Sequence, residues 1–287
     1  MKQAQDLGYK SEARRGLLFV FMAGVLWSTV GLGIRMIDEA TVWQILLYRS
    51  ISLSLFLAIV IYLRSSENLF TVVRAAGLPA CIAGLALVGA YAGGIYGIQS
   101  TSVANAMLLF ASAPFMAAIL GWIFLREKVR KATWISILFA MLGIGIMVQD
   151  KSTGSALLGN LAALGSAFGF AVFTVALRWG RSGEMLPAVF LSGIFAIFIT
   201  SSICILSGLS FQISVNDTSI SMGMGVFQVG AGLVLYTLGS KTLPAAELTL
   251  LSLAEVLLGP LWVYLFLNEV ATFNTLFGGL VLLLAIA

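Results

Sequence analysis

The sequence contains no histidine, only two cysteines and few charged residues, since Asp, Glu, Lys and Arg make up 10% of its 287 residues. Without histidine there is neither an imidazole general base nor an imidazole metal ligand. Cys81 and Cys204 both lie in apolar runs without metal-ligand spacing, and we expect no disulfide between them. The sequence therefore predicts no metal site.

Three common motifs of catalysis and nucleotide binding are also absent. The chain has no G-x-x-x-x-G-K-[ST] phosphate loop, no H-E-x-x-H zinc helix and no G-x-S-x-G nucleophile turn. These absences argue against ATP-driven transport by this chain, a nucleotide partner or another cofactor. Catalytic polar residues do not gather at one membrane interface, so we do not expect an enzyme.

Apolar residues are abundant and form 60% of the sequence. A soluble domain carries roughly 25% charged residues, so the natural solvent for this chain is a lipid bilayer. A spanning helix needs about 20 apolar residues, and the length allows about ten spans. The runs are continuous, which favours helices over the alternating strands of a membrane barrel. The expected spans are 16–37, 42–63, 75–98, 102–125, 132–148, 156–177, 187–207, 219–240, 245–267 and 272–287.

The two ends of the sequence differ in polarity. Residues 1–15 are polar, and we expect a cytoplasmic tail there. The apolar run that follows is long for a signal peptide and lacks an A-x-A cleavage site, so we interpret it as the first span. The last run, 272–287, is short for a span and reaches the final residue, a pattern that truncation would also produce.

Lys and Arg are distributed unevenly among the links. Leaving out the deeply embedded Arg49, thirteen of the remaining fifteen fall in the N-terminal tail or in the second, fourth, sixth and eighth links. By the positive-inside rule this side is cytoplasmic, which places both termini inside the cell. We interpret the net charge of +4 as a signal of orientation in the membrane and not of binding to nucleic acid.

One stretch occurs twice, first at 102–148 and again from 244 to the end. A shift of 142 positions places Phe124-Leu125-x-Glu127 on Phe266-Leu267-x-Glu269, and a shift of 143 places Arg35 on Arg178. Each half holds five expected spans. Because five is an odd number, the second half must enter the membrane upside down. Inverted repeats around a central site are a recurring transporter architecture. The sequence therefore predicts an all-α membrane protein of ten helices, with inverted five-helix repeats at 16–148 and 155–287 around a central cavity.

Three stretches carry a resemblance to a known family. TSVANAMLLFASAPFMAAILGWIFLREKVRKATWISILFAMLGIGIMV, LWSTVGLGIRMI and YRSISLSLFLAIV resemble the EamA-type drug/metabolite transporter superfamily, and the resemblance extends over nearly the whole chain. It implies ten helices in two inverted halves, with spans one to four and six to nine around the cavity. The chain is most similar to the branch that exports aromatic and other neutral amino acids.

Two details connect that resemblance to particular residues. Arg49 matches an arginine that is common in the family. Pro114 departs from the repeat, since its aligned position holds Val256 and the second copy has Pro260 four residues later. Both prolines remove backbone hydrogen bonds within a span and are candidate hinges.

Two ionisable residues lie deep within expected spans. Glu255 is about eleven residues into the ninth span, and Arg49 about eight into the second. An intramembrane charge is costly and points to function. Glu255 is a candidate for binding a substrate amine or carrying a proton, or it is a neutral group bonded to another helix. Arg49 is a counter-charge for a substrate carboxylate or for Glu255, or it is a structural arginine. Glu127 and Glu269 end their helices and are expected to cap turns.

Polar and aromatic residues within the spans complete the predicted cavity. Trp27 and Tyr91 are too deep for the interfacial aromatic belt, and they could stack on a flat substrate or simply pack between helices. The candidate cavity residues are Glu255, Trp27, Ser28, Tyr91, Tyr96, Asn105, Ser112, Gln228, Tyr236 and Arg49.

These observations favour a secondary transporter that exports small metabolites, above all aromatic and other neutral amino acids, across the inner membrane by alternating access. Efflux of cationic drugs or another metabolite is the alternative, followed by a membrane-embedded enzyme or a lipid-handling protein. The expected partners are a small-molecule substrate and the lipid bilayer, with the chain as a monomer or weak dimer.

Overall fold

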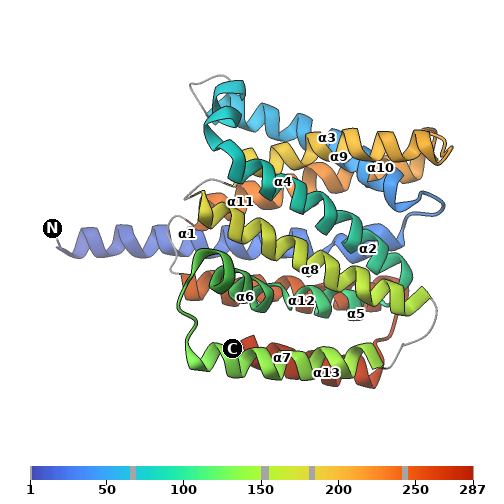
Figure 1. The fold of residues 1–287 in the computed structure, drawn as a ribbon. Helices are drawn as coiled ribbons and strands as arrows, with labels where there is room; N and C mark the ends of the chain where they lie inside the picture. The colour runs from blue at the N-terminus through green and yellow to red at the C-terminus, as the bar shows by residue number, and fades with distance from the viewer. Residues whose placement is uncertain (1, 65–68, 150–154, 181–184, 241–244, 287) are drawn as a thin grey trace.

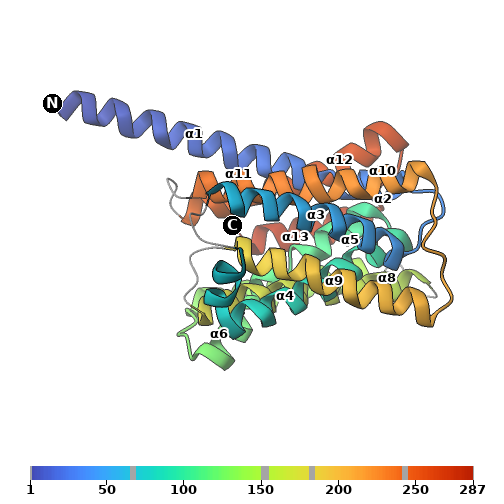
Figure 2. The same ribbon diagram turned by 90° about the horizontal axis from the view of Figure 1, so that it is seen from above.

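The computed structural model describes residues 2–64, 69–149, 155–180, 185–240 and 245–286, and within these ranges every regular element is a helix (Figures 1 and 2). The helices run side by side in one bundle (Figure 1). The elements are α1 (Lys2–Ser28), α2 (Val30–Arg35), α3 (Val42–Arg64), α4 (Leu69–Ser100), α5 (Val103–Phe110), α6 (Ala113–Leu125), α7 (Lys131–Gln149), α8 (Ser155–Trp179), α9 (Leu186–Leu206), α10 (Val215–Gly223), the π-helix η1 (Met224–Ala231), α11 (Gly232–Ser240), α12 (Ala245–Leu267) and α13 (Phe273–Ile286).

Eight helical stretches of the described chain are long and apolar enough to cross a membrane, and Ala254–Leu267 and Phe273–Ala285 are shorter apolar helices. Large apolar side chains cover much of the outside: Leu55, Phe124 and Phe198 each expose at least 60% of their surface. Exposed apolar surface on this scale needs lipid around it. The fold is therefore that of an all-helical membrane protein, as the composition predicts.

Three expected spans are not single continuous helices. The first ends as an α-helix at Ser28 and restarts at Val30, and the fourth breaks between Phe110 and Ala113. At both breaks a hydroxyl bonds to its own helix: the Ser28 and Ser112 Oγ atoms donate to backbone carbonyls three residues earlier, at 2.7 and 2.6 Å. Such bonds compete with the regular backbone ladder and favour a bend. The eighth span is interrupted by η1.

The two candidate hinges lie in different settings. Pro114 is exposed in the first turn of α6, where its missing N–H costs no helical hydrogen bond. Pro260 lies inside α12, which continues through it. A further bend lies in α4 at Gly77, whose φ of +65° favours glycine.

The helices pack in pairs from opposite halves of the chain. α4 packs on α8 and α9, α3 on α9, and α1 on α11 and α12. α7 and α13 pair with each other at one edge of the bundle (Figure 1). Contacts between elements far apart in sequence therefore hold the bundle together.

The interior contains two main apolar clusters. One includes Ile45 and Met107, and the other includes Leu57 and Leu233. Tyr91 packs against both clusters.

Candidate functional site

Arg49 is the most deeply buried cation of the described chain. It lies on α3 with 3% of its surface exposed, and its guanidinium carbon is 4.4 Å from the centroid of the Tyr91 ring on α4. Tyr91 also interacts with Ser192 on α9. No Asp or Glu of the described residues forms an ion pair with Arg49. A guanidinium has five N–H donors, so this one retains donors that could hold a carboxylate.

Beside Arg49, the helices α3 and η1 approach each other closely. A Cβ at Gly225 would overlap both the Arg49 carbonyl oxygen and the Ser52 hydroxyl. Ser52 Oγ in turn donates 2.9 Å to the Met222 carbonyl. The glycine therefore sets how near the two helices lie beside the buried arginine.

A second polar group forms where α1 meets the eighth span. The Trp27 and Tyr236 ring centroids are 5.3 Å apart, and Gln228 Nε2 donates 3.5 Å to the Trp27 carbonyl. Gln228 is 8% exposed, and its Oε1 has no hydrogen-bond partner. It lies within η1, and π-helices are frequent at functional sites. An unpaired buried acceptor of this kind is costly and is suited to a donor on a ligand.

Ser28 connects α1 to α12. It is fully buried, and its Oγ accepts a 2.8 Å hydrogen bond from Trp262 Nε1 on α12. This bond joins residues 234 positions apart. Trp262 was missed by sequence reasoning because its distance from the helix end resembles that of an ordinary belt residue.

Glu255 is partly buried on α12 and has no hydrogen bond or ion pair with another described residue. It does not pair with Arg49. Its neighbour Val256 packs against the first apolar cluster. The side chains of residues 245–253, which precede Glu255 by up to about three turns, are outside the described part of the structure.

Three other candidates lie apart from the two central groups. Asn105 is buried and bonds to Asn160 at 2.5 Å and to Thr275 at 3.4 Å, so its amide has protein partners on α8 and α13. Ser112 is bonded to its own helix. Tyr96 exposes 37% of its surface. The structure thus groups Arg49 with Tyr91, and Trp27 with Gln228 and Tyr236.

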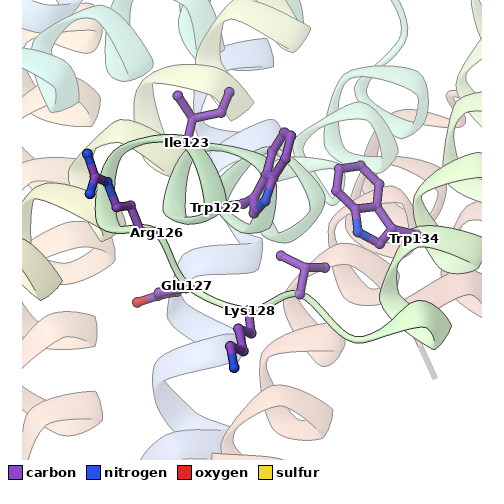
Figure 3. A pocket seen from close by; sticks show the side chains of 7 residues that line it. Trp122, Ile123, Arg126, Glu127, Lys128 and Trp134 are labelled. Carbon is purple, nitrogen blue, oxygen red and sulfur yellow. The ribbon is translucent and has the colours of Figure 1, made fainter.

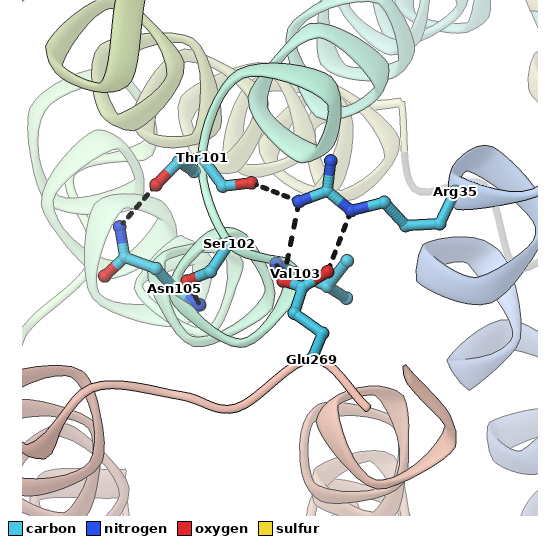
Figure 4. Close-up of polar contacts among 6 residues, drawn as sticks. All are labelled: Arg35, Thr101, Ser102, Val103, Asn105 and Glu269. Carbon is cyan, nitrogen blue, oxygen red and sulfur yellow. Dashed lines mark hydrogen bonds and ion pairs between the residues drawn. The ribbon is translucent and has the colours of Figure 1, made fainter. Parts of the chain in front are cut away.

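An ion pair connects the two halves at one end of the bundle. Arg35 Nε donates 2.9 Å to Glu269 Oε2, while Arg35 Nη2 donates 2.7 Å to the Thr101 carbonyl (Figure 4). Glu269 also accepts a 2.7 Å bond from the Val103 N–H at the start of α5. Glu269 therefore caps a helix from the other half, in addition to its place at the end of α12.

A matching ion pair joins Arg178 to Glu127. The two glutamates share a local geometry: the residue before each, Arg126 or Asn268, has a positive φ of 55° or 52°. Each glutamate N–H donates 3.2 Å to the carbonyl six residues earlier. The pairs differ in exposure, since Arg178 and Glu127 expose 49% and 36% of their side chains, against 27% and 22% for Arg35 and Glu269.

The sequence of the chain is similar to those of known transporters. The model of the EamA-like transporter family matches residues 14–149 and, separately, 157–287. The uncharacterized transporter YwfM of Bacillus subtilis (strain 168) is 28% identical over 60% of this chain and 59% of its own length. The RarD protein of Salmonella typhi is 27% identical over 66% of this chain and 65% of its own.

More distant similarities cover more of the chain. Human solute carrier family 35 member G1 is 21% identical over 92% of this chain and 76% of its own length. A solved crystal structure covers 95% of both chains with a TM-score of 0.66 at 17% identity, which shows a shared fold alone. The chain spans less than two thirds of the length of YwfM and RarD. Because the family model covers both halves of the sequence, the chain belongs to the EamA-like transporter family.

Proposed function

We propose that this protein is a secondary transporter that exports aromatic and other neutral amino acids across the inner membrane by alternating access. The observation that carries the proposal is the buried Arg49, which stacks on Tyr91 and has no carboxylate partner among the described residues. A buried charge is normally paired. A substrate carboxylate would supply the missing partner.

The remaining parts of an amino acid also find matching groups. Trp27 and Tyr236 offer aromatic faces for a flat or apolar side chain. The unpaired Gln228 Oε1 is an acceptor for an ammonium N–H. Trp27 and Tyr91 pack against the same apolar cluster, so both groups border one region of the interior. A zwitterion with an aromatic side chain satisfies all three requirements.

The proposed architecture is ten helices in two inverted five-helix repeats, 16–148 and 155–287, around a central cavity. Two separate matches to one family model support an internal duplication. The helix pairing is also two-fold: α1 packs on α11 and α12 as α8 packs on α4 and α6. The link between the proposed repeats, 150–154, lies outside the described residues.

The two inter-half ion pairs fit alternating access. Arg35–Glu269 and Arg178–Glu127 are related by the offsets of the repeat. Both pairs lie at the C-terminal ends of their helices, and these are opposite ends of the bundle (Figure 1). We propose that each pair closes one end of the pathway and breaks when that end opens. The basic links support a cytoplasmic position for the Arg178–Glu127 end and for both termini, by the positive-inside rule.

Efflux of cationic drugs is the second candidate, and one observation favours it. Glu255 is partly buried and unpaired among the described residues, which suits a cationic ligand. A cation without a carboxylate would use Glu255 and would have no use for Arg49. The two functions therefore predict different essential residues.

Transport by purified protein in proteoliposomes tests the proposal. Exchange of radiolabelled phenylalanine, threonine and methionine is measured for the wild type and for Arg49→Gln, with Arg64→Gln as a matched control because Arg64 is exposed at the end of the same helix. We expect saturable phenylalanine exchange that Arg49→Gln abolishes and Arg64→Gln retains. No exchange of any amino acid by folded protein would refute the proposal.

Two analogues separate the candidates. N-acetylphenylalanine lacks the ammonium group and phenethylamine lacks the carboxylate, so neither should compete strongly with phenylalanine. Strong competition by phenethylamine, together with loss of its transport in Glu255→Gln but not in Arg49→Gln, would favour the cationic alternative.

A further inference from the structure

An open hollow of about 700 Å³ lies where α6 ends and α7 begins, away from the central groups (Figure 3). Two tryptophans form one side of it, with ring centroids 5.4 Å apart in an edge-to-face arrangement at 87°. The connecting turn, which carries charged side chains, forms the rest. Its lining residues are Trp122, Ile123, Arg126, Glu127, Lys128, Val129 and Trp134.

The hollow lies at the boundary between lipid and water. The candidate span Val103–Leu125 ends in the lining of the hollow, and the next span, Lys131–Val148, begins there. Trp122 and Trp134 expose 50% and 37% of their surface. Tryptophan is enriched at this depth because its ring is apolar and its N–H is polar. Ile135 and Leu138, which expose 55% and 63% of their surface, continue the apolar surface along α7 into the lipid-facing region.

The charge at the hollow is positive. The only carboxylate in its lining, Glu127, forms an ion pair with Arg178. No carboxylate of the described residues pairs with Arg126 or Lys128. Their side chains leave the turn on opposite sides, so two cations border the hollow (Figure 3). Arg130 and Lys131 follow in the same turn but do not line it.

We propose that this hollow binds the headgroup of an anionic phospholipid. Arg126 and Lys128, on the two sides of the turn, attract the phosphate and any further negative charge of the headgroup, and the two tryptophans lie at the depth of the glycerol esters. The acyl chains follow the exposed apolar side of α7, beside Leu138 and Met141. Basic pockets between spans recognise lipid phosphates in this way. The proposal is independent of the transported substrate.

Native mass spectrometry of the full-length protein in detergent, titrated with phosphatidylglycerol or phosphatidylcholine, tests the site. The double variant Arg126→Gln/Lys128→Gln removes the cations of the hollow, and Arg130→Gln/Lys131→Gln removes the same charge from the same turn outside it. We expect phosphatidylglycerol to bind the first variant about thirtyfold more weakly than the wild type. The second variant should lose no more than about threefold in affinity for phosphatidylglycerol, because Arg130 and Lys131 act on the headgroup only at a distance.

The controls separate a headgroup site from general electrostatic attraction and from a site for free phosphate. Lys128→Gln alone should weaken binding about fivefold and leaves the left-handed Arg126 in place. Glycerol phosphate in solution, which has the headgroup chemistry without acyl chains, should not displace the lipid at concentrations that saturate a phosphate site. Equal losses in the two double variants, equal binding of phosphatidylcholine, or displacement by glycerol phosphate would each overturn the proposal.

Discussion

Replacing Glu269 with Gln is expected to loosen the end of the bundle where α2, α5 and the turn after α12 meet. The carboxylate accepts bonds from Arg35 at 2.9 and 3.4 Å and from the Val103 N–H at 2.7 Å, so it joins three elements. Glutamine has a similar shape and keeps one acceptor oxygen, but it removes the charge.

The size of the effect follows from the burial of the pair. Hydrogen bonds to charged groups contribute about 1.5–3 kcal/mol and neutral ones about 1 kcal/mol. The side chains of Arg35 and Glu269 are mostly shielded from solvent. We therefore expect Glu269→Gln to destabilise the closed state of this end by about 2 kcal/mol, which changes the ratio of closed to open molecules by a factor of about thirty. Glu127→Gln is the matched control. Its pair is more than a third exposed, and such pairs contribute about 0–1 kcal/mol, at most about fivefold.

Cysteine labelling measures the two ends separately. Cys81 and Cys204 are replaced by Ala, and a single cysteine is introduced at Ile37, beside Arg35, or at Val129, beside Glu127. The reaction rate with a membrane-impermeant maleimide follows the open population of each end. Glu269→Gln should raise labelling at position 37 by about thirtyfold and leave position 129 unchanged or slower.

Two results would refute this reasoning. An unchanged rate at position 37 in folded Glu269→Gln protein would mean that the pair does not hold this end closed. Equal acceleration at both positions would indicate general loosening and not a local closure. The exchange Arg35→Glu/Glu269→Arg should recover part of the closure, because it restores opposite charges at the same sites.

Three further predictions concern contacts elsewhere in the bundle. Ser28→Ala and Trp262→Phe should each lower the free energy of unfolding by about 1 kcal/mol, and the double variant should cost less than the sum, measured by chemical denaturation in detergent micelles. Gln228→Met removes an unpaired buried acceptor, so stability should be unchanged or higher while phenylalanine exchange falls at least tenfold; retained exchange would remove Gln228 from the site. Gly225→Ala should lower the free energy of unfolding by about 1–3 kcal/mol and weaken phenylalanine binding, because the added methyl group must push η1 away from α3 beside Arg49. In the control Gly223→Ala the methyl group meets no atom within 4 Å, so this variant should bind phenylalanine as the wild type does.

Sequence alone placed most helix boundaries to within a few residues. The expected span 245–267 coincides with α12, and 42–63 differs from α3 by one residue. Each boundary depends on local composition, because a segment enters lipid when enough consecutive residues are apolar. The sequence also predicted that Arg35 corresponds to Arg178 and Glu127 to Glu269, from spacings that its two halves share.

Only the tertiary structure decided which side chains meet. Arg35 bonds to Glu269, and Trp262 to Ser28, each across 234 positions. The contact of Arg49 with Tyr91 and the unpaired Oε1 of Gln228 likewise depend on how helices from different parts of the chain are rotated and how closely they approach. Lipid solvates all apolar faces of a helix alike, so hydropathy sets where a span begins and ends but not which face turns inward. Small residues, buried polar groups and inter-helix hydrogen bonds determine that choice, and they act only when the helices are packed.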